Sequence, residues 1–314
     1  MGKGVYGCVW LVKKRKEKKS RYALKKIFHD PLYQDHYLRE ISFLIELDQG
    51  NIIPLLNIYK SSNTLDLYLI YEYMESDLRA VIRANILEDI HKKYIFYQLL
   101  LAIKYLHSAS LIHKNLKPAN VLINSECTIK IVDFMDTLLV GEIPAPKDFV
   151  CARWYLPPEE ILSSSPPTKA VDLWALGCMF GEMLGGTVMF PGTSSMNQIE
   201  RIISFTGYPT DEDLEVLNIK KDKLDSYLEA SNNAHLPFNI NVDQSTKELL
   251  QNILKLNPTK RLSIEKALLH PFVSDFYDPQ EIKVRRPITL PHFTQDLPET
   301  YDKLIYNLKK KQRK

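Results

Sequence analysis

The stretch that decides the fold reads His113-Lys114-Asn115-Leu116-Lys117-Pro118-Ala119-Asn120, and a short apolar run follows it directly. Asp133-Phe134-Met135 stands thirteen residues after Asn120. Farther along come Pro158-Glu159, then Asp172-Leu173-Trp174-Ala175-Leu176-Gly177, then Arg261. Chance assembly of these motifs in this order and at these separations is very improbable, so one fold must account for them together.

A glycine-rich segment stands at the start of the chain. Gly2-Lys3-Gly4-Val5-Tyr6-Gly7-Cys8-Val9 fits the pattern G-x-G-x-x-G-x-V. Glycines let a strand–turn–strand segment approach phosphate groups closely, because no Cβ intervenes. Three glycines also suit an ordinary hairpin, so the pattern alone leaves both interpretations open. A β-prone run, Val9–Val12, follows without an immediate helix, which argues against a dinucleotide-binding motif.

A lysine and a glutamate follow the glycine segment at informative positions. Lys25 lies in the β-prone run Tyr22–Ile27, and Glu40 lies in residues 36–47, whose apolar side chains recur at helical spacing. A lysine that points inward from a strand needs a partner for its charge. A Lys–Glu pair beside a glycine loop is typical of proteins that grip phosphates, whereas a solvated surface lysine is the ordinary alternative.

Composition excludes several classes of protein. The 314 residues are 45% hydrophobic and 25% charged, with 41 Lys+Arg against 38 Asp+Glu and a net charge of +3. These ordinary globular values exclude collagen-like, mucin-like and wholly disordered proteins. The bulk charge predicts neither a nucleic-acid nor a membrane partner. The four cysteines form no C-x-x-C pair, which fits a reducing compartment. We expect a cytoplasmic protein, with the nucleus as the alternative. The basic runs 13–19 and 309–314 are then a solvated loop and tail or nuclear-localisation patches.

The order of the expected elements predicts two parts. The first eighty residues read mostly as strands, with 65–74 as a further run. From about residue 77 the chain is helical, except for short strands at 121–123 and 129–132 and a proline-rich loop at 136–168. The expected helices are 89–107, 171–184, 196–206, 246–256 and 264–269.

Taken together, these motifs resemble the eukaryotic protein kinase domain over nearly the whole chain, and finer motifs resemble the mitogen-activated protein kinases. The finer motifs are Ala152-Arg153-Trp154-Tyr155, Phe190-Pro191-Gly192, residues 196–237, and His270-Pro271-Phe272 followed by Tyr277-Asp278-Pro279. The lysine two residues after Asn115, Lys117, resembles the pattern of the serine/threonine branch rather than that of the tyrosine branch.

The resemblance implies an α+β, two-lobed kinase fold with a small β-rich lobe and a large helical lobe. It implies an N-lobe at 1–74, a C-lobe at 75–276, and a C-terminal extension with a basic tail at 277–314. It also implies ATP as cofactor with Mg²⁺, bound near the hinge behind Tyr71. The nucleotide-binding residues it implies are Gly2, Gly4, Gly7, Val9, Ala23, Lys25, Glu40, Glu72, Met74, Asn120 and Leu122. Asn120 and Asp133 are the implied metal ligands, and Glu159 with Arg261 is an implied structural salt bridge.

The departures from the family pattern bear most on activity. The catalytic position that holds Asp in the H-R-D motif is Asn115, beside Lys117, and an amide accepts no proton at physiological pH. The glycine of D-F-G is Met135, which has less backbone freedom. The chain also begins at the glycine loop without the usual upstream half of the first strand, which leaves a weakened roof over ATP or an incomplete sequence as alternatives.

The regulatory positions depart as well. The Thr-x-Tyr positions of the family hold Lys147-Asp148-Phe149, which offer no hydroxyl. Two arginine positions that would receive the phosphate are Lys114 and Leu138, while Arg39 remains. The threonine that orients the catalytic Asp is Ala152. We therefore expect no activation by phosphorylation of this loop.

Two hypotheses on function follow. The first is a pseudokinase that binds Mg-ATP and acts as a scaffold or allosteric partner. The alternative is an active serine/threonine kinase that transfers the ATP γ-phosphate to protein substrates at a reduced rate. Protein substrates or docking partners are expected in either case, with Asp278 and Glu281 as candidate docking residues and a monomer as the expected state.

Overall fold

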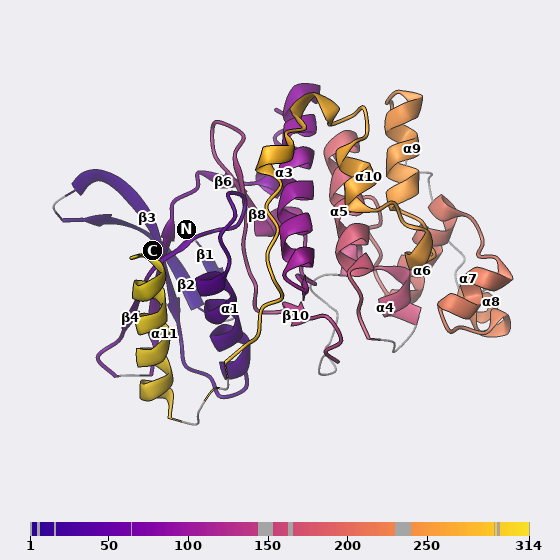
Figure 1. Cartoon of the computed structure of the whole chain (residues 1–314). Coiled ribbons are helices and arrows are strands. Elements are labelled where there is room, and N and C mark those ends of the chain that lie inside the picture. Colours follow the sequence, from indigo (N-terminus) through magenta and orange to yellow (C-terminus); the bar gives the residue numbers. More distant parts are fainter. Residues whose placement is uncertain are drawn as a thin grey trace.

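The computed structural model describes residues 2–4, 7–15, 17–63, 65–143, 153–162, 166–229, 240–291, 293 and 296–313. Figure 1 shows an N-terminal part built on an antiparallel sheet and a larger part built of helices. The predicted fold class, α+β with two lobes, is therefore confirmed. Among the described residues, no helix combines the length and the apolar character needed to cross a bilayer.

Five antiparallel strands in the order β1-β2-β3-β5-β4 form the N-terminal sheet. They are β1 (Gly2–Gly4), β2 (Gly7–Lys14), β3 (Glu17–Ile27), β4 (Leu55–Lys60) and β5 (Leu67–Glu72). Burial alternates along β5, as expected for a strand with one face on a core. β3 lies in the middle of the sheet, where Lys25 faces Val9 of β2 and Leu69 of β5. Within its described residues, the basic run 13–19 includes the end of β2 and the start of β3, which pair as an antiparallel hairpin.

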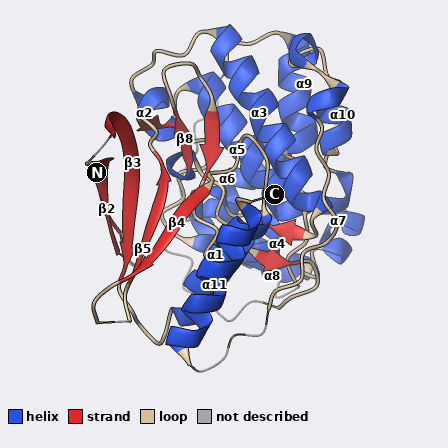
Figure 2. Ribbon diagram, turned by 60° about the vertical axis from the view of Figure 1, so that its left-hand side comes forward, coloured by secondary structure: helices blue, strands red, loops and turns tan. Residues whose placement is uncertain are grey.

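Two helices cover the sheet. α1 (Gln34–Glu46) buries a face that includes Leu38, Ile41 and Leu44, as its helical spacing predicts. α11 (Leu297–Lys311) packs against α1 and β4. Figure 2 shows α11 running diagonally beside the strands of the sheet, next to α1. The basic run 309–314 begins in the last turn of α11: Lys309 and Lys310 are exposed, as expected for a solvated run, and Lys311 donates to the Leu47 carbonyl at 2.6 Å.

The C-terminal part is organised around two central helices, α3 (Asp89–Ser108) and α5 (Ala170–Gly185). Phe96 of α3 stacks on Phe180 of α5 with ring centroids 4.1 Å apart, and Phe272 meets both rings edge-on. α5 ends at Gly186, whose φ of 71° makes it a left-handed cap. The surrounding helices are α2 (Leu78–Arg83), α4 (Pro158–Leu162), α6 (Ser195–Thr206), α7 (Asp211–Val216), α8 (Lys221–Glu229), α9 (Gln244–Ile253) and α10 (Ile264–Leu268).

Short strands between the two parts fix the loops that matter for chemistry. β6 (Ser76–Asp77), β8 (Val121–Ile123) and β9 (Ile129–Ile131) form one small sheet, and β7 (Leu111–Ile112) pairs with β10 (Leu138–Leu139). The segment 113–120 runs from β7 to β8 and ends in the short helix η1 (Pro118–Asn120), and Asp133 comes just after β9. Both segments are therefore anchored at each end.

The structure departs from the sequence-based elements in several places, and the C-terminal helix α11 was also not expected. The expected loop 136–168 contains β10, the short helix η3 (Arg153–Tyr155) and α4 within its described residues. α7 and α8 were not expected, because neither is long enough to show a sustained period.

Candidate active site

A lysine–glutamate ion pair joins the sheet to α1. The Lys25 ammonium on β3 donates to both Glu40 carboxylate oxygens, at 3.1 and 2.8 Å. Burial works to lower the pKa of Lys25, but the carboxylates of Glu40 and Asp133 outweigh it and raise that pKa above its ordinary value. Burial also raises the pKa of Glu40, against the attraction of Lys25 and with repulsion from Asp133. Three groups from three separate segments thus share one electrostatic environment.

The glycine segment forms the hairpin of β1 and β2, where Gly4 pairs with Gly7. A Cβ on Gly7 would lie 1.9 Å from the Lys26 carbonyl oxygen, so no larger residue fits against β3 here. The hairpin apex, residues 5–6, lies outside the described residues. Close packing against β3 therefore requires glycine at position 7, independently of any ligand.

The expected nucleotide-site residues come from several strands. Val9 and Ala23 lie on β2 and β3, and Leu122 lies on β8. At the hinge, Met74 is buried, and the Glu72 carboxylate lies 3.4 Å from the Lys130 ammonium. These residues occupy the strands that flank the Lys25–Glu40 pair and the segment 113–120, but a nucleotide contact for them stays a prediction.

A buried hydroxyl without a partner stands in the same region. Tyr71 of β5 is buried, and its hydroxyl has no hydrogen-bond partner among the described residues. Burial raises its pKa well above the ordinary value, and the charges of Glu40 and Asp133 add to this effect. An unpaired buried polar atom needs an explanation, and a bound ligand, ion or water is one of the explanations.

Three predicted site residues meet at the end of the segment 113–120. The Asn115 side-chain amide donates to Asp133 Oδ2 at 3.0 Å and to Asp136 Oδ2 at 3.2 Å. The Asn120 amide donates to the Asn115 carbonyl at 2.8 Å and to Asp133 Oδ2 at 3.2 Å. Asn115, Asn120 and Asp133 are therefore in direct contact, as the family pattern requires.

Magnesium fits this set of donors. Among the described residues no cluster of three or more His, Cys, Asp and Glu side chains could hold a metal ion. Mg²⁺ does not need one, since it usually takes one or two carboxylates together with substrate phosphates and water. Asp133 supplies a carboxylate, and Asn120 uses its N–H group on neighbouring residues, which leaves its side-chain oxygen as the available ligand.

A buried aspartate holds the segment 113–120 in shape. Asp172 of α5 accepts from the backbone N–H groups of His113 and Lys114, at 2.9 and 3.0 Å, and lies 2.9 Å from His107. Burial alone would raise the pKa of Asp172, but the hydrogen bond and charge of His107 dominate and the pKa is lowered. Lys114 has φ of 65°, a strained conformation for a residue with a side chain. The hydrogen bond from its N–H to Asp172 helps to hold this conformation.

Met135 does not strain the backbone at the position of the family glycine. The positive φ in this motif belongs to Asp133, at 68°, and not to Met135. The Met135 side chain is 2% exposed, and its carbonyl accepts from His36 Nδ1 of α1 at 3.0 Å. The side chain therefore anchors this segment in the core.

Arg39, the arginine that remains of the implied phosphate receptor, contacts a carboxylate. Its guanidinium meets both Glu142 oxygens, at 3.2 and 2.6 Å, and also the Thr137 carbonyl at 3.2 Å. The Leu139 N–H donates to the same Glu142 carboxylate at 2.8 Å. Lys114, at the other receptor position, pairs with Glu160 at 2.6 Å. Residues 147–149 and Ala152 lie outside the described residues, so the expectations placed on them stay predictions.

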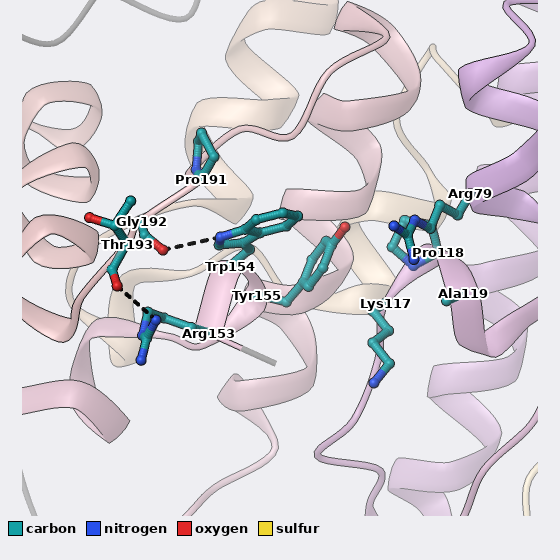
Figure 3. Close-up of a pocket in the computed structure, with 10 residues that line it drawn as sticks. All are labelled: Arg79, Lys117, Pro118, Ala119, Arg153, Trp154, Tyr155, Pro191, Gly192 and Thr193. Atoms are coloured by element: carbon teal, nitrogen blue, oxygen red, sulfur yellow. Dashed lines mark hydrogen bonds between the residues drawn. The ribbon is translucent and has the colours of Figure 1, made fainter. Parts of the chain in front are cut away.

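Lys117, Pro118 and Ala119 of the segment 113–120 line a cavity of about 630 Å³. Figure 3 shows it with Arg79, Pro118 and Ala119 on one side and Trp154, Pro191 and Thr193 on the other. Trp154 donates to the Gly192 carbonyl at 3.1 Å and Arg153 donates to the Thr193 carbonyl at 3.0 Å. Residues 153–155 and the 190–193 segment are thereby tied together.

Two further expectations have clear structural outcomes. Arg261 makes a two-pronged ion pair with Glu159, at 2.7 and 2.6 Å, and lies over the Trp174 ring, so the predicted buried salt bridge is confirmed.

Glu281 accepts from the Tyr97 hydroxyl at 2.9 Å, and Asp278 accepts from the Gln280 N–H at 2.8 Å. These candidate docking residues thus also have structural roles.

Sequence reasoning missed two acidic residues, Asp136 and Glu142. Asp136 directly follows Asp133-Phe134-Met135, and an acid next to the metal-binding motif was a usable signal. Glu142 had a weaker signal, the survival of Arg39 without a phosphorylatable partner in the loop.

Comparisons with known proteins agree with this geometry. The model of the protein kinase domain matches residues 1–273. The chain is 43% identical over 294 residues to extracellular signal-regulated kinase 2 of Dictyostelium discoideum, covering 90% of this chain and 79% of that protein. It is 42% identical to mitogen-activated protein kinase 15 of Xenopus laevis, over 89% of this chain and 50% of that protein. For mitogen-activated protein kinase 15 of Caenorhabditis elegans the identity is 39%, over 90% of this chain and 63% of that protein.

The chain thus spans only half to two thirds of the length of the last two relatives. Matches of this extent, together with the contacts of Lys25 with Glu40 and of Asn120 with Asp133, establish that the chain belongs to the protein kinase family, among the mitogen-activated protein kinases.

Proposed function

We propose that this protein binds Mg-ATP between the N-terminal sheet and the segment 113–120. The observation that carries the proposal is the closed Lys25–Glu40 ion pair, whose lysine also feels the charge of Asp133. In protein kinases this pair and the metal-binding aspartate must both be in place for phosphate binding. The buried Tyr71 hydroxyl without a partner among the described residues supports a ligand at the same place.

Each proposed nucleotide residue has a distinct role. The hairpin lies close over the phosphates because Gly2, Gly4 and Gly7 carry no side chains. Lys25 neutralises phosphate charge, and Glu40 orients Lys25. Asn120 and Asp133 hold Mg²⁺. Glu72 and Met74 offer hinge backbone to the base, and Val9, Ala23 and Leu122 supply apolar contacts. Bound Mg-ATP supplies a transferable phosphoryl group, and the chain positions it.

The two uses of bound nucleotide rest on different observations. The pseudokinase proposal, in which Mg-ATP stabilises a scaffold or allosteric partner, rests on Asn115, whose amide already donates to two carboxylates. The second candidate, a slow serine/threonine kinase, is favoured by the closed Lys25–Glu40 pair, an arrangement that phosphoryl transfer requires. Transfer above the background of Asp133→Ala separates the two.

The remaining expectations stay proposals. We propose the lobe boundaries 1–74, 75–276 and 277–314, and a monomer in the cytoplasm or nucleus that contacts protein partners. Docking through Asp278 and Glu281 would have to use carboxylates that already accept hydrogen bonds within the protein, from the Gln280 N–H and from the Tyr97 hydroxyl of α3.

Thermal unfolding tests nucleotide binding. Mg-ATP at about a hundred times its dissociation constant adds roughly 2.7 kcal/mol to the free energy of unfolding, so the melting temperature should rise. Lys25→Ala and Asp133→Ala should reduce the rise. Lys104→Ala is a matched control, because Lys104 pairs with Glu265 at the surface of the helical part. No rise for the wild type at millimolar Mg-ATP contradicts the proposal.

A further inference from the structure

The side chain at the base position joins two carboxylates. Asn115 Nδ2 carries two hydrogens and donates to Asp133 Oδ2 at 3.0 Å and to Asp136 Oδ2 at 3.2 Å. Asp133 is the proposed metal ligand, which leaves Asp136 as the carboxylate in contact with Asn115 that has no assigned role. The negative charge absent from position 115 is thus present one hydrogen bond away.

The backbone around Asp136 is held from both sides. The Thr137 N–H donates to the Phe134 carbonyl at 3.2 Å, which closes a turn with Met135 and Asp136 at its centre. The Phe134 and Met135 side chains are buried, at 0% and 2% exposed. His36 binds the Met135 carbonyl and Arg39 binds the Thr137 carbonyl, so α1 fixes the turn. The contact between Asp136 and Asn115 is therefore built into the fold.

We infer that Asp136 is the proton acceptor for phosphoryl transfer in this protein. The inference rests on the proposed Mg-ATP binding and deepens the slow-kinase candidate. The acceptor is a serine or threonine hydroxyl of a protein. Its O–H bond breaks and the proton passes to the Asp136 carboxylate, while its oxygen bonds to the γ-phosphorus. The bond between that phosphorus and the β-bridging oxygen breaks, and ADP leaves with the electron pair.

Asn115 then has a positioning role. Its amide N–H group holds Asp136, and its side-chain oxygen remains as an acceptor that can orient the hydroxyl. A carboxylate takes a proton during transfer, whereas an amide cannot, and a positioned base contributes about a hundred- to ten-thousand-fold. Because Asn115 orients the hydroxyl and Asp136 takes its proton, phosphoryl transfer does not need an aspartate at position 115.

Asp136→Asn is the decisive variant, because it separates a chemical role from a structural one. The amide introduced there keeps a side-chain oxygen that accepts from the Asn115 amide but cannot hold the proton. Transfer from Mg-ATP to dephosphorylated casein is measured with the full chain, against the Asp133→Ala background. We expect kcat to fall by about a hundredfold or more. The KM for ATP and the Mg-ATP shift in melting temperature should stay within about twofold, because no nucleotide ligand changes.

The exchanged pair Asn115→Asp with Asp136→Asn supplies the rescue. It keeps one carboxylate and one amide in contact and places the carboxylate at position 115, so kcat should return to within about tenfold of the wild type or exceed it. Asp222→Asn, on the exposed surface of α8, is the matched control and should leave kcat unchanged.

Three outcomes overturn the inference. If Asp136→Asn transfers phosphate as fast as the wild type, Asp136 has at most a structural role. If the wild type does not exceed the Asp133→Ala background while Mg-ATP still raises its melting temperature, nucleotide binding stands and the pseudokinase proposal replaces the inference. If Mg-ATP does not raise the wild-type melting temperature, the proposed function fails together with the inference.

Discussion

At the scale of single residues, this protein concentrates its departures from the kinase pattern around two carboxylates. Asn115 donates one amide hydrogen to Asp133 and the other to Asp136. An aspartate at position 115 would remove both donors and bring a third negative charge to the same place. Restoring the family residue is therefore not equivalent to restoring the family site.

We predict that Asn115→Asp lowers stability in the absence of Mg²⁺. Loss of the shared donor leaves two carboxylates facing a third, and because these groups are only half-buried the loss should be about 1 kcal/mol, at the low end of the cost for a buried polar group. Excess Mg²⁺ should recover part of this loss, since it neutralises the cluster. Chemical denaturation with and without Mg²⁺ measures both effects. Asn115→Ala, which removes the donor without adding charge, is the control and should show a smaller Mg²⁺ dependence; equal dependence in the two variants would refute the electrostatic explanation.

At the scale of elements, α1 is the part through which the site is assembled. Its Glu40 meets Lys25 of β3, its His36 meets the Met135 carbonyl, and its Arg39 meets Glu142. The last contact is an ion pair between α1 and the segment beside β10. The segment beside β10 is consequently attached to α1 without any modification.

We predict that Glu142→Gln loosens this segment without unfolding the protein. The Arg39–Glu142 pair is part-exposed, at 20% and 33% for the two side chains, so its loss should cost only about 0.2–1 kcal/mol of global stability. Amide hydrogen exchange at Leu139, whose N–H donates to Glu142, should become faster. Glu265→Gln, which breaks the Lys104–Glu265 pair, is the matched control and should leave that exchange unchanged. Unaltered exchange at residues 137–142 in Glu142→Gln would show that the carboxylate does not hold the segment.

At the scale of the whole molecule, the last helix returns to the N-terminal part. Tyr301 of α11 is fully buried, and its hydroxyl lies 3.1 Å from the Tyr37 hydroxyl of α1 and donates to the Leu65 carbonyl at 2.9 Å. Residues more than two hundred positions apart therefore share one small network. Through it, the C-terminal helix supports the helix that carries Glu40.

We predict that Tyr301→Phe lowers the free energy of unfolding by about 1 kcal/mol, because it removes the hydroxyl that contacts the buried Tyr37 hydroxyl and donates to the Leu65 carbonyl. Tyr306→Phe is a matched control on the same helix. Tyr306 is 65% exposed, so its substitution should stay within about 0.5 kcal/mol of the wild type. Urea denaturation compares the two. A similar loss for both variants would mean that the buried network contributes nothing specific.

The sequence by itself determined the family, the two-part architecture and most of the site. Motifs such as 113–120 and 133–135 depend on local residue types, and the spacing of apolar residues set α1, α3 and α5 because the period of a helix or strand is a local property. Even the missed helix α11 had a local signal in Leu297, Tyr301, Leu304 and Leu308, which recur at helical spacing.

Only the tertiary structure decided which charges meet. The contacts of Asn115 with Asp136 and of Arg39 with Glu142 join residues 21 and 103 positions apart. No periodicity relates such positions, and each contact depends on where a turn or strand is held by buried neighbours such as Phe134 and Met135. An ion pair or hydrogen bond requires atoms within about 3 Å, and packing sets that distance, not spacing along the chain. For this reason the sequence showed that a base is absent from position 115, whereas the carboxylate next to it became visible only in the folded chain.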